Sequence, residues 1–384
     1  MSVSMANWLD QQALVRERRG LVRRPAPRGP ADAVIDLASN DYLALSRDPR
    51  LAAAAADAAH EWGTGATASR LVAGTTSLHL ELESALAALV GMESALAFSS
   101  GYLANLGVVT ALGGPGTLVV ADEQCHASIV DGCRLSRSRT ETFAHNDADD
   151  AARLLAGRAE PRALIAVESI YSVGGDAAPL GRLLEIAVEH DAVLLVDEAH
   201  SLGVSGTGAF AGRGSIAGTA LAGHPNVVVT ATLSKSLGSQ GGAVLGPARL
   251  REHLVNRSRT FIFDTALAPT SAAAALAALG ILRDEPWRAD RVRAHAAALV
   301  AGLAGFASVR PSAGAVQSVA MPSAESAAAA ARVAGEAGIR VGCFRPPSVP
   351  DGVSRLRLTA HAGLAPPDIA RAIAVLRDIL EEAS

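Results

Sequence analysis

Lysine is almost absent from this sequence of 384 residues. Lysine and arginine together number 34, and Lys235 is the only lysine among them. Such a bias, with abundant alanine, is typical of a GC-rich coding background that supplies arginine wherever a solvated positive charge is needed. The remaining lysine is either a chance survivor or a residue that arginine cannot replace, because arginine stays protonated whereas lysine can lose its proton and form a Schiff base.

The sequence also has few cysteines, a small net charge and no long apolar run, and each of these features argues against a class of protein. Three cysteines without paired spacing argue against a disulfide framework and a cysteine-based metal site, so we expect no metal. A formal net charge of −4 argues against a nucleic-acid binder. No apolar run approaches the roughly 20 residues of a membrane span, and the N-terminus lacks a signal-peptide pattern. We therefore expect a globular cytoplasmic protein that binds neither nucleic acid nor membrane.

Short apolar runs alternate with helical stretches in the first two thirds of the chain. The runs are bounded by glycine, proline or aspartate and are typical of buried strands; they lie at 95–98, 118–120, 163–167, 193–196 and 227–230. A helix that begins near Pro179 places Leu180, Leu183 and Leu184 on one face. This alternation predicts an α/β fold with a mostly parallel central sheet and helices on both faces.

The pattern changes near Glu285. Residues 266–306 are alanine-rich and helical, with a break at Glu285 and Pro286. An apolar run at 315–321, a helix from about Ser323, strands at 339–341 and 356–359, and a helix after Pro367 follow. We expect an N-terminal arm (1–45), a large α/β domain (46–285) and a smaller C-terminal α+β domain (286–384).

Lys235 lies just past the run at 227–230, in a turn rich in hydroxyl groups. In parallel α/β sheets, ligands bind beyond the carboxyl ends of the strands. The hydroxyls of Thr232, Ser234 and Ser236 are therefore candidates to bind a phosphate. The turn is not a P-loop, because the glycines that precede Lys-Ser in that motif are missing.

Asp197 and His200 follow the run at 193–196, in the tetrad Asp-Glu-Ala-His. The same tetrad occurs in helicases, but a helicase needs a phosphate-binding lysine loop, and Lys235 is not in one. Asp197 is then either a carboxylate that pairs with a heterocyclic cation or a simple turn cap.

Three further runs end in polar residues. Gly101 and Tyr102 open a helix whose N-terminal N–H groups favour a phosphate. His126 and Ser172 follow two other runs; a lone histidine is often structural, but at this position its ring can stack on a flat cofactor. Five strand ends thus supply the parts that pyridoxal phosphate (PLP) requires, including an acid for its pyridine nitrogen and a lysine for a Schiff base.

Several stretches resemble the α-oxoamine synthases, which are PLP enzymes of fold type I. Besides the Lys235 turn, the matching stretches run in order along nearly the whole chain, at 38–43, 68–74, 100–105, 126–128, 168–172, 197–200, 345–350 and 355–359. The resemblance implies a fold type I PLP-dependent transferase and a homodimer. The family often has Phe-Gly before the lysine, where this chain has Leu233 and Ser234.

The resemblance also implies roles for individual residues. Lys235 would form the Schiff base, Asp197 would pair with the pyridine nitrogen, and His126 would stack on the ring. The other residues expected to bind the cofactor are Gly101, Tyr102, Ser172, His200, Thr232 and, from a neighbouring subunit, Thr265. The residues expected around the substrates are Arg23, Asn40, His126, Arg345, Ser348 and Arg357, with Arg357 on the amino-acid carboxylate.

The stretch at 345–348 favours the branch of this family that serves biotin synthesis. The implied reaction is a decarboxylative condensation of L-alanine with pimeloyl-CoA, or with a pimeloyl carrier protein, in which Lys235 removes the Cα proton. The alternatives are a sibling enzyme that uses glycine with another acyl-CoA, a PLP lyase or aminotransferase, and a PLP-binding sensor without catalysis.

Overall fold

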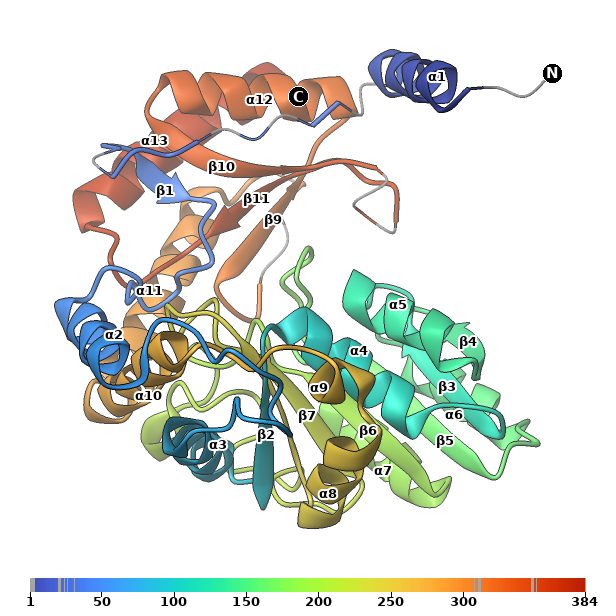
Figure 1. Ribbon diagram of the computed structural model, residues 1–384. Helices are drawn as coiled ribbons and strands as arrows, with labels where there is room; N and C mark the ends of the chain where they lie inside the picture. The colour runs from blue at the N-terminus through green and yellow to red at the C-terminus, as the bar shows by residue number, and fades with distance from the viewer. Residues whose placement is uncertain are drawn as a thin grey trace.

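The strands of the protein form two sheets in a computed structural model (Figure 1). The structure describes residues 4–383 except residues 20, 21, 24, 26, 31, 307, 310, 311, 347, 348 and 350. Within this part of the chain, the larger sheet has the strand order β2-β8-β7-β6-β5-β3-β4, and the smaller sheet has the order β1-β10-β11-β9.

The larger sheet is mostly parallel, which confirms the expectation from the sequence. Its strands are β2 (Ser94–Phe98), β3 (Thr117–Asp122), β4 (Arg139–Phe143), β5 (Arg162–Glu168), β6 (Ala192–Asp197), β7 (Val227–Thr232) and β8 (Gly242–Gly246). Strands β3 to β7 pair in parallel with one another, and β8 runs antiparallel to β2 and β7. Each predicted run lies inside one of these strands. Sequence reasoning missed two strands: β4, which is polar and lies at the edge of the sheet, and β8, which begins and ends with a glycine.

Hydrophobic clusters cover both faces of the larger sheet. In β3, Leu118 and Val120 belong to one cluster and Val119 and Ala121 to the other, because successive side chains of a strand point to opposite faces. The helices of one face are α3 (Ser77–Val90), α6 (Ala148–Ala156), α7 (Leu180–Glu189) and α10 (Pro269–Asp284), with α2 (Pro49–Trp62) packed on α10. The helices of the other face are α4 (Gly101–Leu112), α5 (Ala127–Ser136), α8 (Ala248–Arg257) and α9 (Arg259–Ile262).

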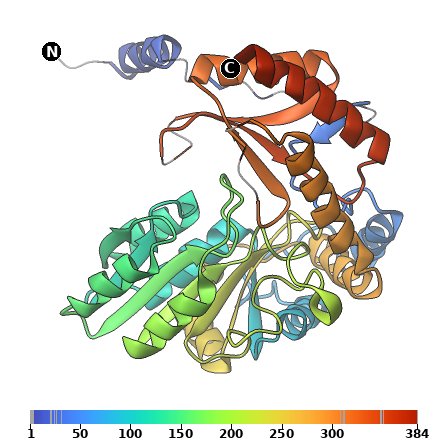
Figure 2. The ribbon, with the colours of Figure 1, turned by 180° about the vertical axis from the view of Figure 1, so that it is seen from behind.

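The smaller sheet combines segments from both ends of the chain. Strand β1 (Ile35–Leu37) pairs in parallel with β10 (Ile339–Phe344), and β11 (Arg355–Thr359) pairs antiparallel with both β10 and β9 (Val316–Ala320). The helices α11 (Trp287–Gly302), α12 (Ala324–Glu336) and α13 (Pro366–Ala383) share its hydrophobic core. Figures 1 and 2 show this unit above the larger sheet. A domain boundary near residue 285, between α10 and α11, stays a prediction.

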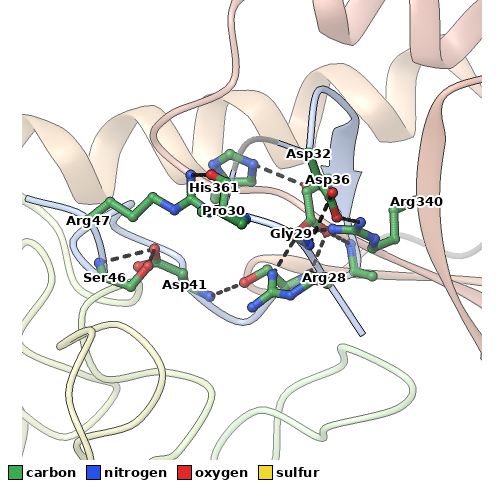
Figure 3. A network of polar contacts seen from close by, with 12 residues as sticks. Arg28, Gly29, Pro30, Asp32, Asp36, Asp41, Ser46, Arg47, Arg340 and His361 are labelled. Carbon is green, nitrogen blue, oxygen red and sulfur yellow. Dashed lines mark hydrogen bonds and ion pairs between the residues drawn. The ribbon is translucent and has the colours of Figure 1, made fainter. Parts of the chain in front are cut away.

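Ion pairs fasten the segment before β1 to the smaller sheet (Figure 3). Arg340 of β10 donates to Asp32 Oδ2 at 3.1 Å and to Asp36 Oδ2 at 3.2 Å, and an Arg28 nitrogen lies 3.6 Å from the same Asp36 oxygen. Because β1 continues directly into the segment that contains Tyr42, this fastening also helps to place the buried Tyr42 ring.

The helix α1 (Met5–Arg18) lies apart from the rest of the molecule in Figures 1 and 2. None of its described residues is buried, and Met5, Trp8 and Leu9 are each about half exposed or more. Sequence reasoning treated this region as an arm and did not predict the helix. No helix in the described part of the chain has the length and apolar composition needed to cross a membrane.

Candidate active site

A cavity of about 230 Å³ lies at the carboxyl ends of β5, β6 and β7, next to the first turns of α4 and α5. The predicted residues that line it are Gly101, Tyr102, His126, Asp197, His200, Thr232, Ser234 and Lys235. These residues lie between Gly101 and Lys235 in the sequence, and the structure brings them together at one edge of the sheet. Ligands of α/β folds bind at this edge.

Lys235 contributes the amine of this cavity. Its Nζ lies 2.7 Å from His200 Nε2. Burial lowers the pKa of Lys235 from its ordinary value of 10.5 to about 8, although the charge of Asp197, and that of Glu168 where it is ionised, acts in the opposite direction. About a tenth of this amine is therefore neutral at pH 7 and about half at pH 8, and the neutral amine can act as a nucleophile or a base.

A chain of hydrogen bonds extends from Lys235 through His200. The hydroxyl of Tyr42 lies 2.6 Å from His200 Nδ1 and donates to Asn40 Oδ1 at 3.2 Å. Because Tyr42 gives its proton to Asn40, the hydrogen-bond network places a proton on His200 Nδ1 and leaves Nε2 as an acceptor. Burial, and then the positive charges of Lys235 and Arg357, hold the pKa of His200 well below its ordinary value, so His200 is neutral.

Asp197 is the buried carboxylate of the cavity and is 4% exposed. Its Oδ1 accepts from the Ala199 N–H at 2.9 Å, and its Oδ2 accepts from Asn105 Nδ2 at 2.6 Å. Asn105 is fixed in turn by Thr230, whose hydroxyl donates to Asn105 Oδ1 at 2.7 Å. Both donors to Asp197 are neutral, and each carboxylate oxygen keeps a lone pair for a further donor.

His126 and Gly101 form two other walls of the cavity. His126 caps the N-terminus of α5, and its Nδ1 lies 2.7 Å from the hydroxyl of Ser128. Gly101 begins α4 so close to β7 that a Cβ built on it would lie 3.0 Å from Thr232 Cβ. The first turn of α4, Thr232 and Ser234 thus line one end of the cavity with N–H and hydroxyl groups.

Glu168, at the end of β5, is a buried acid that sequence reasoning did not assign. Its Oε2 accepts from the Ser172 N–H at 3.0 Å, whereas its Oε1 has no hydrogen-bond partner among the described residues. Burial, and then the charge of Asp197, raise the pKa of Glu168 to about 8. At neutral pH Glu168 therefore carries a proton, which makes it a possible hydrogen-bond donor in the cavity.

Arg357 contacts Asn40 and Ser172 beside the cavity. Arg357 lies on β11 and is 3% exposed. Its Nε donates to the Ser172 carbonyl at 2.7 Å, and one terminal nitrogen donates to Asn40 Oδ1 at 3.0 Å and to Thr359 Oγ1 at 3.3 Å. The smaller sheet therefore presents a guanidinium group to the site of Lys235.

Other predicted residues do not join this group. Arg345 lines a separate cavity of about 690 Å³ with Arg19, Met321 and Val353, and the exposed Arg23 lines neither cavity. Thr265 pairs with Ser69 in an isolated β-bridge and does not line the Lys235 cavity either.

Two further expectations need comment. Ser348 lies outside the described residues. The proposal that Ser236 helps to bind a phosphate is wrong, because its buried hydroxyl donates to the Leu202 carbonyl at 2.5 Å instead of lining the cavity.

Sequence reasoning missed Asn105, Ser128, Glu168 and Tyr42 as functional residues. Asn105, Ser128 and Tyr42 lie inside the matching stretches at 100–105, 126–128 and 38–43, and Glu168 opens the stretch at 168–172. The matching stretches therefore contained these residues, but the sequence does not show which side of a strand or helix faces the cavity.

Comparison with known proteins identifies the family. The model of the aminotransferase class I and II family matches residues 32–376. The chain belongs to this family. It is 53% identical to the 8-amino-7-oxononanoate synthase of Mycolicibacterium gilvum (strain PYR-GCK) over 376 residues, 98% of this chain and 97% of the relative. It is 52% identical to the enzyme of the same name from Mycobacterium avium (strain 104) over 380 residues, 99% of this chain and 98% of the relative.

Solved structures share the fold over most of the chain. A serine palmitoyltransferase variant from S. paucimobilis with a bound PLP–myriocin aldimine matches with a TM-score of 0.91 and 30% identity, covering 99% of both chains. An 8-amino-7-oxononanoate synthase from Francisella tularensis matches with a TM-score of 0.75 and 25% identity, covering 91% of this chain and 99% of that one. The expected fold and the resemblance to the α-oxoamine synthases are confirmed.

Proposed function

We propose that the Lys235 cavity binds PLP. Two features support the fit. Asp197 is a buried carboxylate that forms no ion pair among the described residues, which suits it to hold the protonated pyridine nitrogen. The close approach of Gly101 to Thr232 leaves a cradle of N–H and hydroxyl groups at the N-terminus of α4, which suits a phosphate. When bound, PLP supplies a conjugated ring that can delocalise the negative charge formed at Cα of an amino acid.

The residues of this chain have distinct tasks in the proposed chemistry. Lys235 would hold the cofactor through its Nζ, and the same Nζ, with its lowered pKa, would accept the Cα proton of the bound amino acid. Asp197 would keep the ring nitrogen protonated, and His126 would stack on the ring. His200, held neutral with Nε2 as acceptor, would hydrogen-bond a ring substituent together with Ser172.

Substrate binding is assigned to the smaller sheet and the segment after β1. Arg357 and Asn40 hold the amino-acid carboxylate, because the guanidinium group is fixed by Ser172 and Asn40 at the rim of the cavity. Arg345, in its separate cavity, and Arg23 and Ser348 are assigned to the acyl donor. Gly101, Tyr102 and Thr232 hold the phosphate.

We infer that the reaction is the condensation of L-alanine with pimeloyl-CoA, or with a pimeloyl carrier protein, to give 8-amino-7-oxononanoate, the free thiol and carbon dioxide in biotin synthesis. The observation that carries this inference is the identity of 53% to a named 8-amino-7-oxononanoate synthase over 98% of the chain. The Lys235, Asp197 and Arg357 arrangement is consistent with a PLP-dependent acyltransferase.

The substrate assignment is tested by thiol release. Holoprotein is supplied with L-alanine and pimeloyl-CoA, and in parallel with glycine or L-serine and acetyl-, succinyl- or palmitoyl-CoA. We expect the fastest release of CoA, together with formation of 8-amino-7-oxononanoate, from L-alanine and pimeloyl-CoA. Faster turnover with another pair would overturn the substrate assignment, and a bound cofactor without any turnover would favour the sensor alternative.

A sibling activity is the second candidate. The TM-score to serine palmitoyltransferase, 0.91, exceeds that to the Francisella tularensis 8-amino-7-oxononanoate synthase, 0.75. We favour the first activity because the serine palmitoyltransferase is only 30% identical, whereas the named relatives exceed 50%. The L-serine and palmitoyl-CoA arm of the assay separates the two activities.

We also propose a homodimer. Leu71, Val72 and Phe263 are large apolar side chains that are more than half exposed, and they flank the bridge between Ser69 and Thr265. Covering this surface with a second copy would place Thr265 near the interface, as its assignment to a neighbouring cofactor requires. Sedimentation at micromolar concentration should give twice the mass of one chain, and a purely monomeric holoprotein would contradict the proposal. A cytoplasmic location stays a prediction.

A further inference from the structure

His145 lies between two carboxylates outside the Lys235 cavity. Its Nδ1 is 2.9 Å from Asp122 Oδ1, and its Nε2 is 2.7 Å from Asp176 Oδ2. Ionised carboxylates only accept hydrogen bonds, so both ring nitrogens must carry protons and the imidazole is a cation. Burial alone would lower the pKa of His145, but the hydrogen bonds that the ring donates to the two carboxylates, together with their charges, outweigh burial and raise that pKa to about 9.

The cluster joins three loops at the carboxyl edge of the larger sheet. Asp122 ends β3, His145 follows β4, and Asp176 belongs to the turn after β5. Asn146 strengthens the cluster, since its N–H donates to Asp122 Oδ2 at 2.8 Å and its Nδ2 donates to Asp176 Oδ2 at 2.7 Å. The other groups near His145 are the Tyr171 ring, packed edge-on with centroids 4.4 Å apart, and Glu123, which accepts from the His145 N–H.

The turn that contains Asp176 is seated against the smaller sheet. Its Gly175 carbonyl accepts from the Ala313 N–H at 2.8 Å and from Ser312 Oγ at 3.1 Å. Gly175 has a φ of +77°, and a Cβ on it would lie 2.2 Å from the Val316 carbonyl oxygen. Such a close approach of two backbones requires glycine at this position.

The same turn also holds the guanidinium group of Arg357. The Ser172 carbonyl accepts from Arg357 Nε at 2.7 Å, and the Ser172 N–H donates to Glu168 Oε2 at 3.0 Å. Within the turn, the Tyr171 N–H donates to the Asp176 carbonyl at 2.9 Å, and the Gly175 N–H donates to the Tyr171 carbonyl at 2.9 Å. The Ser172 backbone, which orients Arg357, is thus connected through a few hydrogen bonds to Asp176, the residue that His145 contacts.

We propose that the Asp122–His145–Asp176 cluster positions Arg357 for the amino-acid carboxylate by holding the turn of residues 171–176 in place. His145 and Asp176 are positioning residues, because neither lines the cavity of Lys235 and both act through Ser172. This inference rests on the proposed function, in which Arg357 binds the carboxylate of L-alanine.

Asp176→Asn tests the proposal with little change of shape. The substitution removes the charge that pairs with His145 at the more exposed end of the cluster, where the Asp176 side chain is 38% exposed. We expect the Kd and KM for L-alanine to rise about five- to tenfold while kcat changes less than about twofold, because a misplaced binding group weakens substrate positioning. Asp290→Asn is the matched control, since Asp290 is also an exposed carboxylate that pairs with a cationic side chain, here Arg293 of α11, far from this turn in the sequence.

A pH profile supplies a readout that a loss of stability alone would not give. The amino-acid affinity of the unmodified protein should weaken as the pH rises through about 9 and His145 loses its proton. In Asp176→Asn the midpoint should lie at lower pH, because one of the two carboxylates that raise the pKa of His145 is gone. The KM for the acyl-CoA should not follow this shift.

Ser312→Ala provides a second variant from the opposite side of the turn. It removes the hydroxyl that donates to the Gly175 carbonyl and that also bonds to the backbone of Gly314, while the Ala313 N–H still donates to Gly175, so it should weaken L-alanine binding about two- to threefold. If Asp176→Asn fails to fold, this variant decides the question in the same titration. Wild-type affinity for L-alanine in the folded variants, with an unmoved pH midpoint, overturns the proposal. If the unmodified holoprotein itself neither binds nor turns over L-alanine, the proposed function fails instead.

Discussion

Arg357→Ala should weaken L-alanine binding without removing the cofactor. Arg357 is almost fully buried and reaches the rim of the Lys235 cavity, where it is held by Ser172 and Asn40. Hydrogen bonds to a charged group contribute about 1.5–3 kcal/mol, so loss of the guanidinium group should raise the Kd for L-alanine about ten- to hundredfold. Arg357→Lys keeps the charge but loses the planar fork, and should fall between the wild type and the alanine variant.

The measurement is a titration of holoprotein with L-alanine, followed by the change in visible absorbance. Arg355→Lys is the matched control on the same strand, because Arg355 pairs with Asp351 and does not contact Asn40 or Ser172. Removing Arg357 also leaves the Ser172 carbonyl without its donor, which costs about 1–3 kcal/mol of stability, so each variant is compared only where it is fully folded. A folded Arg357→Ala variant with wild-type affinity for L-alanine would refute the reasoning.

Two further outcomes follow from the contacts around Lys235. Tyr42→Phe removes the acceptor of the His200 Nδ1 proton and should lower the melting temperature. The substitution should also move the pH at which the bound cofactor changes its absorbance. An unchanged spectral midpoint would contradict the tautomer assigned to His200. Because the pKa of Lys235 is lowered to about 8, the rate at which apoprotein takes up PLP should rise with pH and level off above about 8; a rate that still rises towards pH 10 would mean that the amine is not perturbed.

The sequence predicted the parts of the fold that repeat a local pattern. The buried strands β2, β3, β5, β6 and β7 are recognisable as apolar runs. Because ligands of parallel sheets bind beyond the carboxyl ends of the strands, the sequence alone predicted that Lys235, Asp197 and His126 lie at one edge of the sheet. The pairing of strands that are far apart in the sequence could not be predicted. The three residues of β1 are too few to be recognised as a strand, and they form one only because β10, some 300 residues later, pairs with them.

Side-chain direction explains most of what the sequence could not supply within the site. Glu168 and Asn105 were passed over because a buried acid at the end of a strand, or a buried amide within a helix, has no periodic signature. Only the hydrogen bonds to Ser172, Asp197 and Thr230 reveal the tasks of these two residues. Ser236 was overestimated for the same reason, since one residue beyond Lys235 the backbone turns its hydroxyl toward the core.

The central claim is that Lys235 is covalently attached to PLP, and the single lysine makes it directly measurable. Holoprotein is reduced with borohydride, unfolded and analysed by mass spectrometry of the intact chain and its peptides. The account predicts one reduced cofactor per chain, located on Lys235, and none on the Lys235→Arg variant. A cofactor mass that persists in Lys235→Arg, or that maps to the N-terminal amine, would contradict it.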